Sequence, residues 1–254
     1  MPAMPIFRRV MSSTSPLPPG LRAGDAFWDV SRRDNLTIRT SGSDEYLTGI
    51  STAYGDGAFS QSTETLQPKL VADASGVKYA RTDGVDDVLN GDATIEAMLQ
   101  DVSGGSVFVI GHWETAPSTT QQLLALSNGL SAGQIRLGIR GVSSSYEAGA
   151  RRLDADSYYS VTGGSGPTSK AIFGSMADYT GQTLTVLRAN GTLTTAAKAW
   201  GSGNTSNTAS VAASLGSSGQ AFRAYGWGVF PRAITESEWR SIRVWASKHY
   251  RFAI

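Results

Sequence analysis

The sequence predicts an all-β domain, either a sandwich or a barrel, that carries one short α-helix near its C-terminal end. Three observations lead to this fold class. Short segments rich in β-branched and aromatic residues recur between clusters of Gly, Ser, Asn and Asp. An Asn-Gly pair at residues 190–191 marks a tight hairpin. A stretch at residues 235–250 shows the apolar spacing of a helix.

The chain starts with a segment, residues 1–22, that is rich in Pro and in small polar residues. This composition predicts an extended N-terminal arm outside the folded domain, which we place at residues 23–254. The arm lacks the apolar run of a secretion signal, and the chain has no stretch of about 18 apolar residues that predicts a membrane span. We expect the arm to dock on other proteins of an assembly through Ile6, Phe7, Arg8 and Arg9.

Eight segments have the composition and length of strands, and turn residues separate them. They are residues 35–39, 77–81, 106–111, 122–126, 134–139, 171–176, 183–188 and 221–230. In the third of these, Val107 and Val109 alternate with Phe108 and Ile110, so both faces are apolar. Such a strand is expected in the middle of a sheet that is covered on both sides.

Thr235 or Ile234 opens the predicted helix, and the Thr side chain is suited to an N-cap. Glu236 and Glu238 lie in its first turn, where the helix dipole favours negative charge. Trp239 and Trp245 recur at helical spacing and form an apolar face that can cover part of a sheet. We expect four tryptophans in the core: Trp28, Trp227, Trp239 and Trp245.

Three stretches rich in Gly, Ser and Thr are long for turns: residues 41–65, 141–169 and 194–220. We expect them to be loops, and long loops in a compact domain are commonly functional. They are therefore the expected places for binding.

The composition excludes several function classes. The formal net charge is +1, with 22 Lys and Arg against 21 Asp and Glu, so no global field attracts nucleic acid or an anionic membrane. The chain has no Cys and only two His, which makes a zinc site improbable and excludes disulfides. We expect no cofactor, with calcium as the exception considered below.

Three segments, taken in order, carry a resemblance to a known family. They are residues 27–37 (FWDVSRRDNLT), residues 67–70 with 79–89 (QPKL and YARTDGVDDVL), and residues 225–239 (YGWGVFPRAITESEW). Together they resemble the laminin-G-like members of the concanavalin A-like lectin/glucanase superfamily, which recur in virion proteins and bacterial surface proteins. Gly226 or Trp227 stands where the family usually has an acidic residue in the last strand.

The resemblance implies a two-sheet antiparallel jelly-roll sandwich over roughly residues 26–254, with a short C-terminal α-helix. The N-terminal arm lies outside it. The catalytic relatives in this superfamily use a Glu-x-Asp-x-x-Glu strand, and this pattern is absent from the sequence. Asp44 and Glu45 suit a turn, and Glu236 and Glu238 suit a helix start, so we expect no catalytic activity.

Glycan binding requires exposed aromatic rings and planar polar groups. Several such residues lie among Ser, Thr, Gly and Asn, which indicates surface positions. The candidates are Trp113, Tyr146, Arg151, Tyr158, Tyr159 and Trp200. The alternative for each is a half-buried loop anchor or a contact with another subunit.

A cluster of carboxylates follows the second predicted strand. Asp83, Asp86 and Asp87 lie within a few residues of one another, and Ca²⁺ prefers such oxygen-rich loops. The same Asp-Gly-x-Asp-Asp pattern also suits a turn in which the carboxylates accept backbone N–H groups. The sequence leaves both roles open.

The resemblance and the arm together favour a non-catalytic structural protein of a virion or virus-like particle, such as a capsid decoration, head-fibre or tail-fibre component. We expect it on the particle surface, within an oligomeric assembly, with host surface polysaccharide as a further partner. The first alternative is a freestanding carbohydrate-binding or adhesin module, which would be extracellular. The second is a glycan hydrolase with an unrecognised site.

Overall fold

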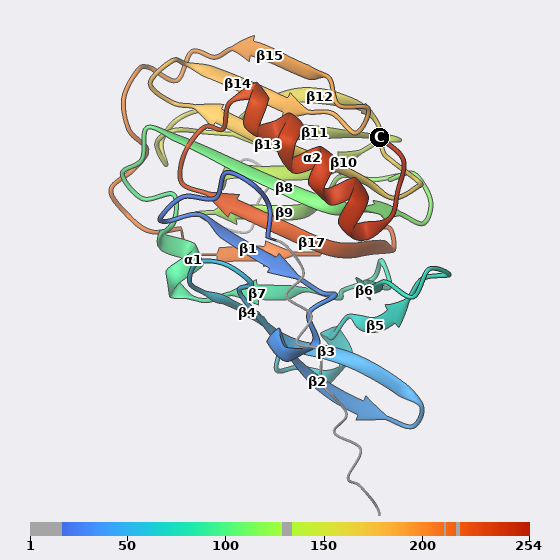
Figure 1. Cartoon of the computed structure of the whole chain (residues 1–254). Coiled ribbons are helices and arrows are strands. Elements are labelled where there is room, and N and C mark those ends of the chain that lie inside the picture. The colour runs from blue at the N-terminus through green and yellow to red at the C-terminus, as the bar shows by residue number, and fades with distance from the viewer. Residues whose placement is uncertain (1–16, 129–133, 211, 217–218) are drawn as a thin grey trace, which may run out of the picture.

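The computed structural model describes residues 17–128, 134–210, 212–216 and 219–254. Its strands form two antiparallel sheets that stack face to face, and one long helix lies outside them (Figure 1). This confirms the predicted all-β sandwich of jelly-roll type with a C-terminal helix. None of the helices in the described part of the chain is long and apolar enough to cross a membrane.

The front sheet is the one that faces the viewer in Figure 1, next to the long helix. Its neighbouring strands are, in order, β5 (Lys69–Ala72), β6 (Lys78–Arg81), β17 (Phe222–Phe230), β8 (Gly104–Trp113), β13 (Ala171–Asp178), β14 (Thr183–Leu187) and β15 (Leu193–Ala197). Strand β1 (Ala26–Asp29) pairs with β17 on the same side as β6. The Asn-Gly hairpin joins β14 to β15 as predicted, and Gly191 has a φ of +91°.

The back sheet is the second layer of the sandwich and lies behind the front sheet in Figure 1. Its neighbouring strands are, in order, β4 (Ala58–Ser60), β7 (Leu89–Gly91), β16 (Ala212–Leu215), β9 (Gln121–Ser127), β10 (Ile135–Val142), β11 (Ser145–Ala150) and β12 (Tyr159–Ser165). The hairpin of β2 (Leu36–Ser41) and β3 (Asp44–Ser51) connects the two sheets, because β3 pairs with both β4 and β5. Three short helices complete the described elements: η1 (Arg33–Asn35), η2 (Glu64–Leu66) and α1 (Ala93–Ala97).

Aromatic rings fill the space between the sheets. Trp28 of β1 stacks on Trp227 of β17 with ring centroids 6.1 Å apart, and Phe59 of β4 meets both rings edge-on. All three side chains are fully buried. Offset and edge-to-face pairs of this kind add to the stabilisation that burial of the ring area gives. The strand alternation of the sequence thus produces one cluster between the sheets and a second cluster on the outer face of the front sheet.

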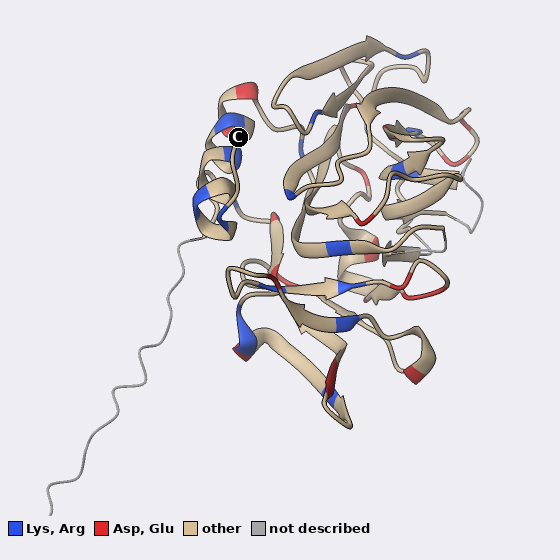
Figure 2. Ribbon diagram, turned by 90° about the vertical axis from the view of Figure 1, so that its right-hand side faces the viewer, with Lys and Arg blue, Asp and Glu red and all other residues tan. Residues whose placement is uncertain are grey.

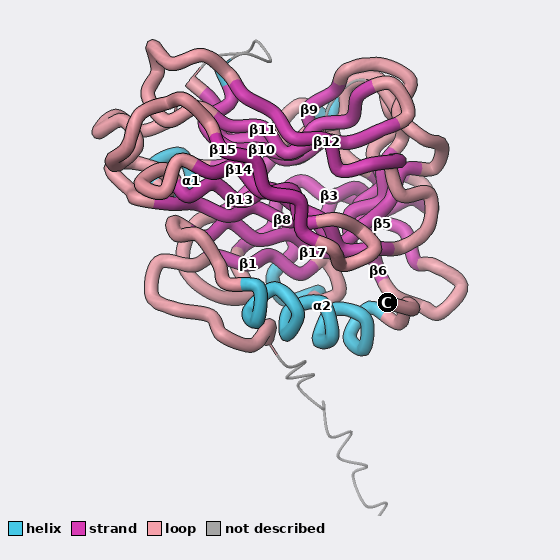
Figure 3. The backbone as a smooth tube through the Cα atoms, turned by 90° about the horizontal axis from the view of Figure 1, so that it is seen from above, coloured by secondary structure: helices cyan, strands magenta, loops and turns pink. Residues whose placement is uncertain are grey.

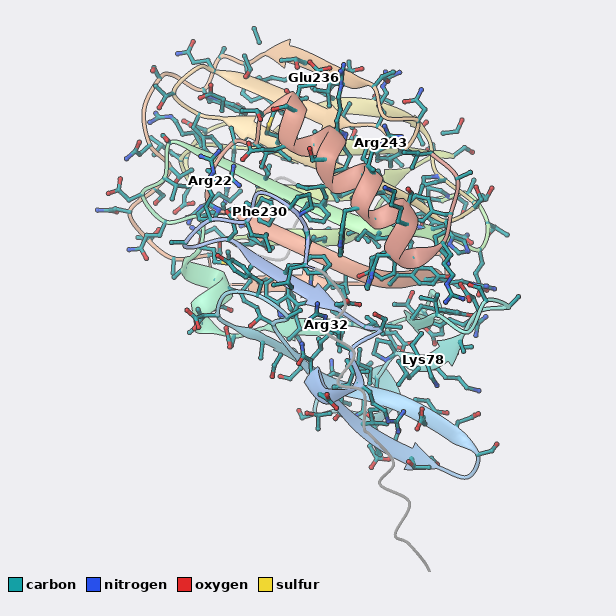
Figure 4. All side chains as sticks on the ribbon, in the orientation of Figure 1. Arg22, Arg32, Lys78, Phe230, Glu236 and Arg243 are labelled. Atoms are coloured by element: carbon teal, nitrogen blue, oxygen red, sulfur yellow. The ribbon has the colours of Figure 1, made fainter. Side chains whose placement is uncertain are left out.

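Helix α2 (Glu236–Tyr250) covers the outer face of the front sheet (Figure 3). Thr235 caps it through a capping box with Glu238. Its apolar side packs on outward-facing residues of the sheet, among them Phe230, which is labelled to the left of the helix in Figure 4. Trp239 is fully buried there and Trp245 is 9% exposed, so the predicted core role of the four tryptophans is confirmed.

Residues 17–22, the last part of the predicted arm, pack beside the start of α2. Arg22 makes an ion pair with Glu238 at 2.7 Å, and Arg232 donates a hydrogen bond to the carbonyl of Gly20 at 3.2 Å. Arg22 is labelled in Figure 4. Ile6, Phe7, Arg8 and Arg9 lie outside the described residues.

The expectation of three long loops is wrong. Residues 41–65 contain β3 and β4, residues 141–169 contain β11 and β12, and residues 194–220 contain β16 and most of β15. Glycines serve close packing in these strands. A Cβ on Gly149 would lie 1.8 Å from the Tyr158 hydroxyl, and a Cβ on Gly163 would lie 2.4 Å from the Tyr146 ring.

Candidate functional site

A polar groove of about 510 Å³ opens on the outer face of the front sheet, below the region that α2 covers. The size is that of a small-ligand site. Its lining comes from the β2–β3 hairpin, from η2 and the residue after it, from β5 and β6, and from the turn that follows β6. We call it the outer groove, and it is lined by Arg39, Ser41, Tyr46, Glu64, Thr65, Gln67, Lys69, Arg81, Asp83 and Asp87.

Strand register brings the central residues of the outer groove together. Arg39 of β2 lies directly opposite Tyr46 of β3, Tyr46 lies opposite Lys69 of β5, and Lys69 lies opposite Arg81 of β6. Directly opposed residues of an antiparallel pair project from the same face of the sheet. The next residues along these strands, such as Leu47, Leu70 and Ala80, therefore point into the core. Four strands that are neighbours in space, β2, β3, β5 and β6, thus present one row of side chains on the outer face.

The floor of the outer groove is an aromatic ring with a guanidinium stacked on it. The Arg39 guanidinium lies 4.6 Å from the centre of the half-buried Tyr46 ring, within the range of a cation–π contact. Arg39 Nε donates to the Gln67 side-chain carbonyl at 2.8 Å, and Gln67 Nε2 donates to the Gln61 carbonyl at 3.0 Å. These bonds hold two planar polar groups in fixed orientations beside the ring.

Ion pairs compensate most of the basic side chains of this face. Lys69 pairs with Asp44 at 2.7 Å, and both Arg81 and Arg223 donate to Glu114, at 2.7 and 3.0 Å. The hydrogen bonds from Arg81 lower the pKa of Glu114 to about 2, against the opposing effect of its partial burial. Glu114 is therefore an anion at neutral pH.

The predicted acidic turn forms one rim of the outer groove. Asp87 Oδ2 accepts the N–H of Asp83, and Asp83 Oδ1 accepts the N–H of Val85, at 2.8 Å each. Burial, together with the charges of Asp83 and Asp86, raises the pKa of Asp87 to about 6. Gly84 has a φ of +80°, and a Cβ there would lie 2.5 Å from the backbone nitrogen of Ala221, so the turn requires glycine.

The turn-bonding role of these carboxylates is thus present in the fold. Ligand atoms from Asp83, Asp86 and Asp87 also lie within 4.8 Å of one another, a spacing compatible with a shared cation. A carboxylate oxygen that already accepts a backbone N–H has fewer lone pairs left to coordinate a cation, so the turn-bonding role weakens the calcium-binding role. We therefore expect turn bonding to be the role of this cluster, with calcium binding as the alternative.

Most residues predicted to bind a glycan are buried, so the expectation that they are exposed is wrong. Trp113 and Tyr146 are 0% exposed and pack together in the core with Phe173. Trp200 is 3% exposed and packs on Tyr179. Arg151 is 6% exposed, and its guanidinium donates to the backbone carbonyl of Asp154. The polar sequence neighbours of Trp113 and Tyr146 point to the opposite face of the sheet, which made these residues look exposed.

Tyr158 and Tyr159 are half-buried on the side of the back sheet. The Tyr158 hydroxyl donates to Glu147 at 3.2 Å, and the Arg140 guanidinium lies 4.5 Å from the centre of its ring. Arg140 in turn makes a close ion pair with Glu147. Tyr159 packs edge-on against Trp200. Both tyrosines therefore make packing contacts within the domain, and glycan binding by them stays a prediction.

The sequence pointed to Asp83 and Asp87 but not to Arg39, Tyr46, Gln67 and Lys69 of the outer groove. One signal was available, since Thr37, Arg39 and Ser41 alternate with Leu36 and Ile38 and so mark a strand with one polar face. Which strands lie beside this one is set by long-range pairing, and no local pattern in the sequence contains that information.

No protein-family model matches the sequence, and no curated protein matches it. Solved structures share the fold. One is a structure of botulinum neurotoxin type C, a toxin whose entrance into cells depends on interaction with two ganglioside molecules. It is 12% identical to this chain, with a TM-score of 0.53, and the match covers 84% of this chain and 50% of that chain. The binding domain of botulinum neurotoxin DC in complex with SialylT is 12% identical with a TM-score of 0.50, and the match covers 85% and 51%.

Trypanosoma rangeli sialidase is 9% identical with a TM-score of 0.53, and the match covers 90% of this chain and 33% of that chain. This chain thus spans about half of the neurotoxin chains and a third of the sialidase. At such low identity these similarities concern the fold alone, which is a jelly-roll β-sandwich.

Proposed function

We propose that this protein is a non-catalytic carbohydrate-binding module that holds a glycan in the outer groove. The observation that carries the proposal is the pairing of the Tyr46 ring with the Arg39 guanidinium, which the buried Gln67 amide holds in place, in one groove. A sugar ring presents an apolar face, which suits an aromatic ring, and a rim of hydroxyls, which suits amide, guanidinium and carboxylate groups.

The fold comparisons support this choice over a purely structural role. Two of the similar structures are botulinum neurotoxin proteins, one dependent on gangliosides and one in complex with SialylT. The fold of this chain is therefore compatible with glycan binding. The fold does not identify the ligand, which is argued from the residues of the groove.

The charges of the outer groove favour a hydroxyl-rich, uncharged ligand. Its lining contains three cationic side chains, from Arg39, Lys69 and Arg81, and three carboxylates, among them those of Asp83 and Asp87. At pH 7 these charges balance, so the groove has no excess charge with which to attract a polyanion. Ionised donors and acceptors nevertheless make strong hydrogen bonds to hydroxyls.

A titration calorimetry panel of neutral and acidic oligosaccharides tests the proposal. We expect binding of a neutral glycan, a loss of at least about tenfold in affinity for Tyr46→Ala, and near wild-type affinity for Tyr46→Phe, which keeps the ring. The matched charge control is Arg33→Ala, whose side chain is 63% exposed and pairs with Glu45 on the other face of the hairpin. Equal affinity of wild type and Tyr46→Ala would contradict the proposal.

The absence of catalysis is part of the proposal and has its own test. A hydrolase of the retaining or inverting kind needs two carboxyl groups across the scissile bond. In our proposal Asp83 and Asp87 instead hold the turn, through the backbone bonds described above. Incubation with the polysaccharides that bind should release no oligosaccharide, and release of reducing ends by the purified protein would show a hydrolase.

We further propose that the N-terminal arm attaches this module to a virion or virus-like particle, at whose surface the outer groove meets host polysaccharide. The support is the anchorage of residues 17–22 to the domain, through the ion pair of Arg22 with Glu238 of α2 and the hydrogen bond from Arg232 to Gly20. Deletion of residues 2–16 should leave this anchorage and the fold intact while abolishing incorporation. Normal incorporation of the shortened chain would refute the attachment, and secretion of a free, active lectin would support the freestanding extracellular alternative.

A further inference from the structure

The row of opposed residues does not stop at the edge of the outer groove. Arg81 of β6 lies directly opposite Arg223 of β17, and Arg223 lies directly opposite His112 of β8. All three side chains project from the outer face, since their neighbours Ala80, Ala224 and Trp113 point into the core. Basic segments accordingly lie one above another on adjacent strands in Figure 2.

We infer that the outer groove is one end of a longer track, perpendicular to the strands, that binds the interior of a linear neutral polysaccharide. This inference rests on the proposed glycan binding and adds the class of ligand. The track is the cross-strand row Arg39, Tyr46, Lys69, Arg81, Arg223 and His112.

The length of the track exceeds what one sugar needs. The row crosses from β2 through β3, β5, β6 and β17 to β8, which is five steps between neighbouring strands. With strands about 4.8 Å apart, the row is roughly 24 Å long. A monosaccharide fills only a fraction of this length, whereas a chain of several sugars can follow the row and meet a side chain from each strand.

The side chains of the track are accessible. The exposed fraction is 26% for Arg39, 39% for Lys69, 40% for Arg81 and 34% for Arg223. These values describe side chains whose stems are packed while their polar ends reach solvent. The track is thus an open surface, which suits the interior of a long chain better than a closed pocket that accepts only a chain end.

Two buried tyrosines support the upper part of the track. The Arg223 guanidinium lies 5.2 Å from the centre of the Tyr79 ring, and the His112 ring stacks on Tyr225 at 6.1 Å. These contacts limit the rotamers of Arg223 and His112, so that little conformational entropy is lost when a ligand binds.

The polar groups at the ends of the track's side chains suit hydroxyl groups. Glu114 bridges Arg81 and Arg223 and compensates part of their charge. Burial, followed by the charges of Arg223 and Lys170, lowers the pKa of His112 to about 4, so its imidazole is neutral at pH 7. Since Nδ1 of His112 is buried, the imidazole offers a hydroxyl group its other nitrogen, Nε2. The cations of the track thus have carboxylate partners, with Arg81 and Arg223 sharing one, and this leaves little unpaired charge to favour a polyanion.

The test is the dependence of affinity on ligand length, measured by calorimetry with cello-, xylo-, manno- and chito-oligosaccharides from the disaccharide to the octasaccharide. For the series that binds, we expect the affinity of the wild-type protein to rise at least about tenfold between the disaccharide and the hexasaccharide. Arg223→Ala should lower hexasaccharide affinity about fivefold and leave disaccharide affinity unchanged. Arg240→Ala, which removes a 70% exposed cation from α2, is the matched control and should change neither.

The outcomes separate the track from the proposed function. A disaccharide that binds as tightly as the hexasaccharide would overturn the track and leave glycan binding in the outer groove standing. An equal loss of disaccharide and hexasaccharide affinity in Arg223→Ala would also overturn it. Tight binding only of heparin or polygalacturonate would overturn its neutral character. If no oligosaccharide of any length binds, the proposed function itself fails.

Discussion

The buried carboxyl of Asp87 makes the stability of the fold depend on pH in a direction that a substitution can test. Asp87 is 6% exposed, and its carboxylate accepts the N–H of Asp83 while facing the like charges of Asp83 and Asp86. Asp87→Asn removes the ionisable group and keeps an oxygen that can accept the same bond. We expect this variant to be more stable than the wild type at neutral pH.

The expected magnitude follows from the pKa of Asp87, which is raised from 3.8 to about 6. Since one pKa unit corresponds to about 1.4 kcal/mol, ionisation in the folded protein costs at most about 3 kcal/mol relative to the unfolded chain. The neutral carboxyl is favoured by folding, so its contribution is fully present below pH 3.8 and is lost as the pH rises through about 6. The advantage of Asp87→Asn should therefore be absent in acid and largest above pH 7.

Urea unfolding curves of both proteins across this pH range measure the difference directly. We expect equal free energies of unfolding near pH 3 and a gain of about 1 to 3 kcal/mol for Asp87→Asn at pH 8. The control is Asp56→Asn, at an exposed loop carboxyl, which should change stability by less than about 0.5 kcal/mol. A pH-independent difference between wild type and Asp87→Asn would refute the reasoning.

Three further predictions concern the core, the acidic turn and the ligand. Trp113→Ala should lower the free energy of unfolding by about 3 to 5 kcal/mol because the ring is fully buried. A variant as stable as the wild type in urea unfolding would contradict the place of this ring in the core. The melting temperature should be the same in EDTA and in excess Ca²⁺, because the oxygens of Asp83 and Asp87 already accept backbone N–H groups; a rise of several degrees would show a calcium site. Affinity for a neutral glycan should change less than about twofold between about 50 and 500 mM NaCl, whereas a steep fall would indicate a charged ligand.

Local patterns were sufficient to predict the fold class. Alternation in β8, the Asn-Gly hairpin and the helix after Thr235 each depend on neighbours within a few residues, and all three are present. The strands β11 and β12 were missed because their glycines and serines resemble a loop. Gly149 and Gly163 make room for tyrosine rings that come from other segments, a requirement that is invisible without the tertiary structure.

The candidate site was much less predictable than the fold. Polar neighbours made Trp113 and Tyr146 look exposed, although strand alternation directs those neighbours to the opposite face. Conversely, Arg39 and Tyr46 become a site only because β2, β3, β5 and β6 are adjacent in one register. Residues far apart in the chain form the outer groove, so its geometry had to come from the structure.

The central claim is that a glycan occupies the outer groove. Chemical-shift mapping of the isotope-labelled protein during titration with the tightest-binding oligosaccharide tests it most directly. The account predicts that the shifts that change lie in β2, β3, β5 and β6, with the largest changes at Tyr46 and Arg39, and that Tyr158 and Tyr159 on the side of the back sheet do not change. Saturable changes confined to the back sheet, with none at Tyr46, would contradict it.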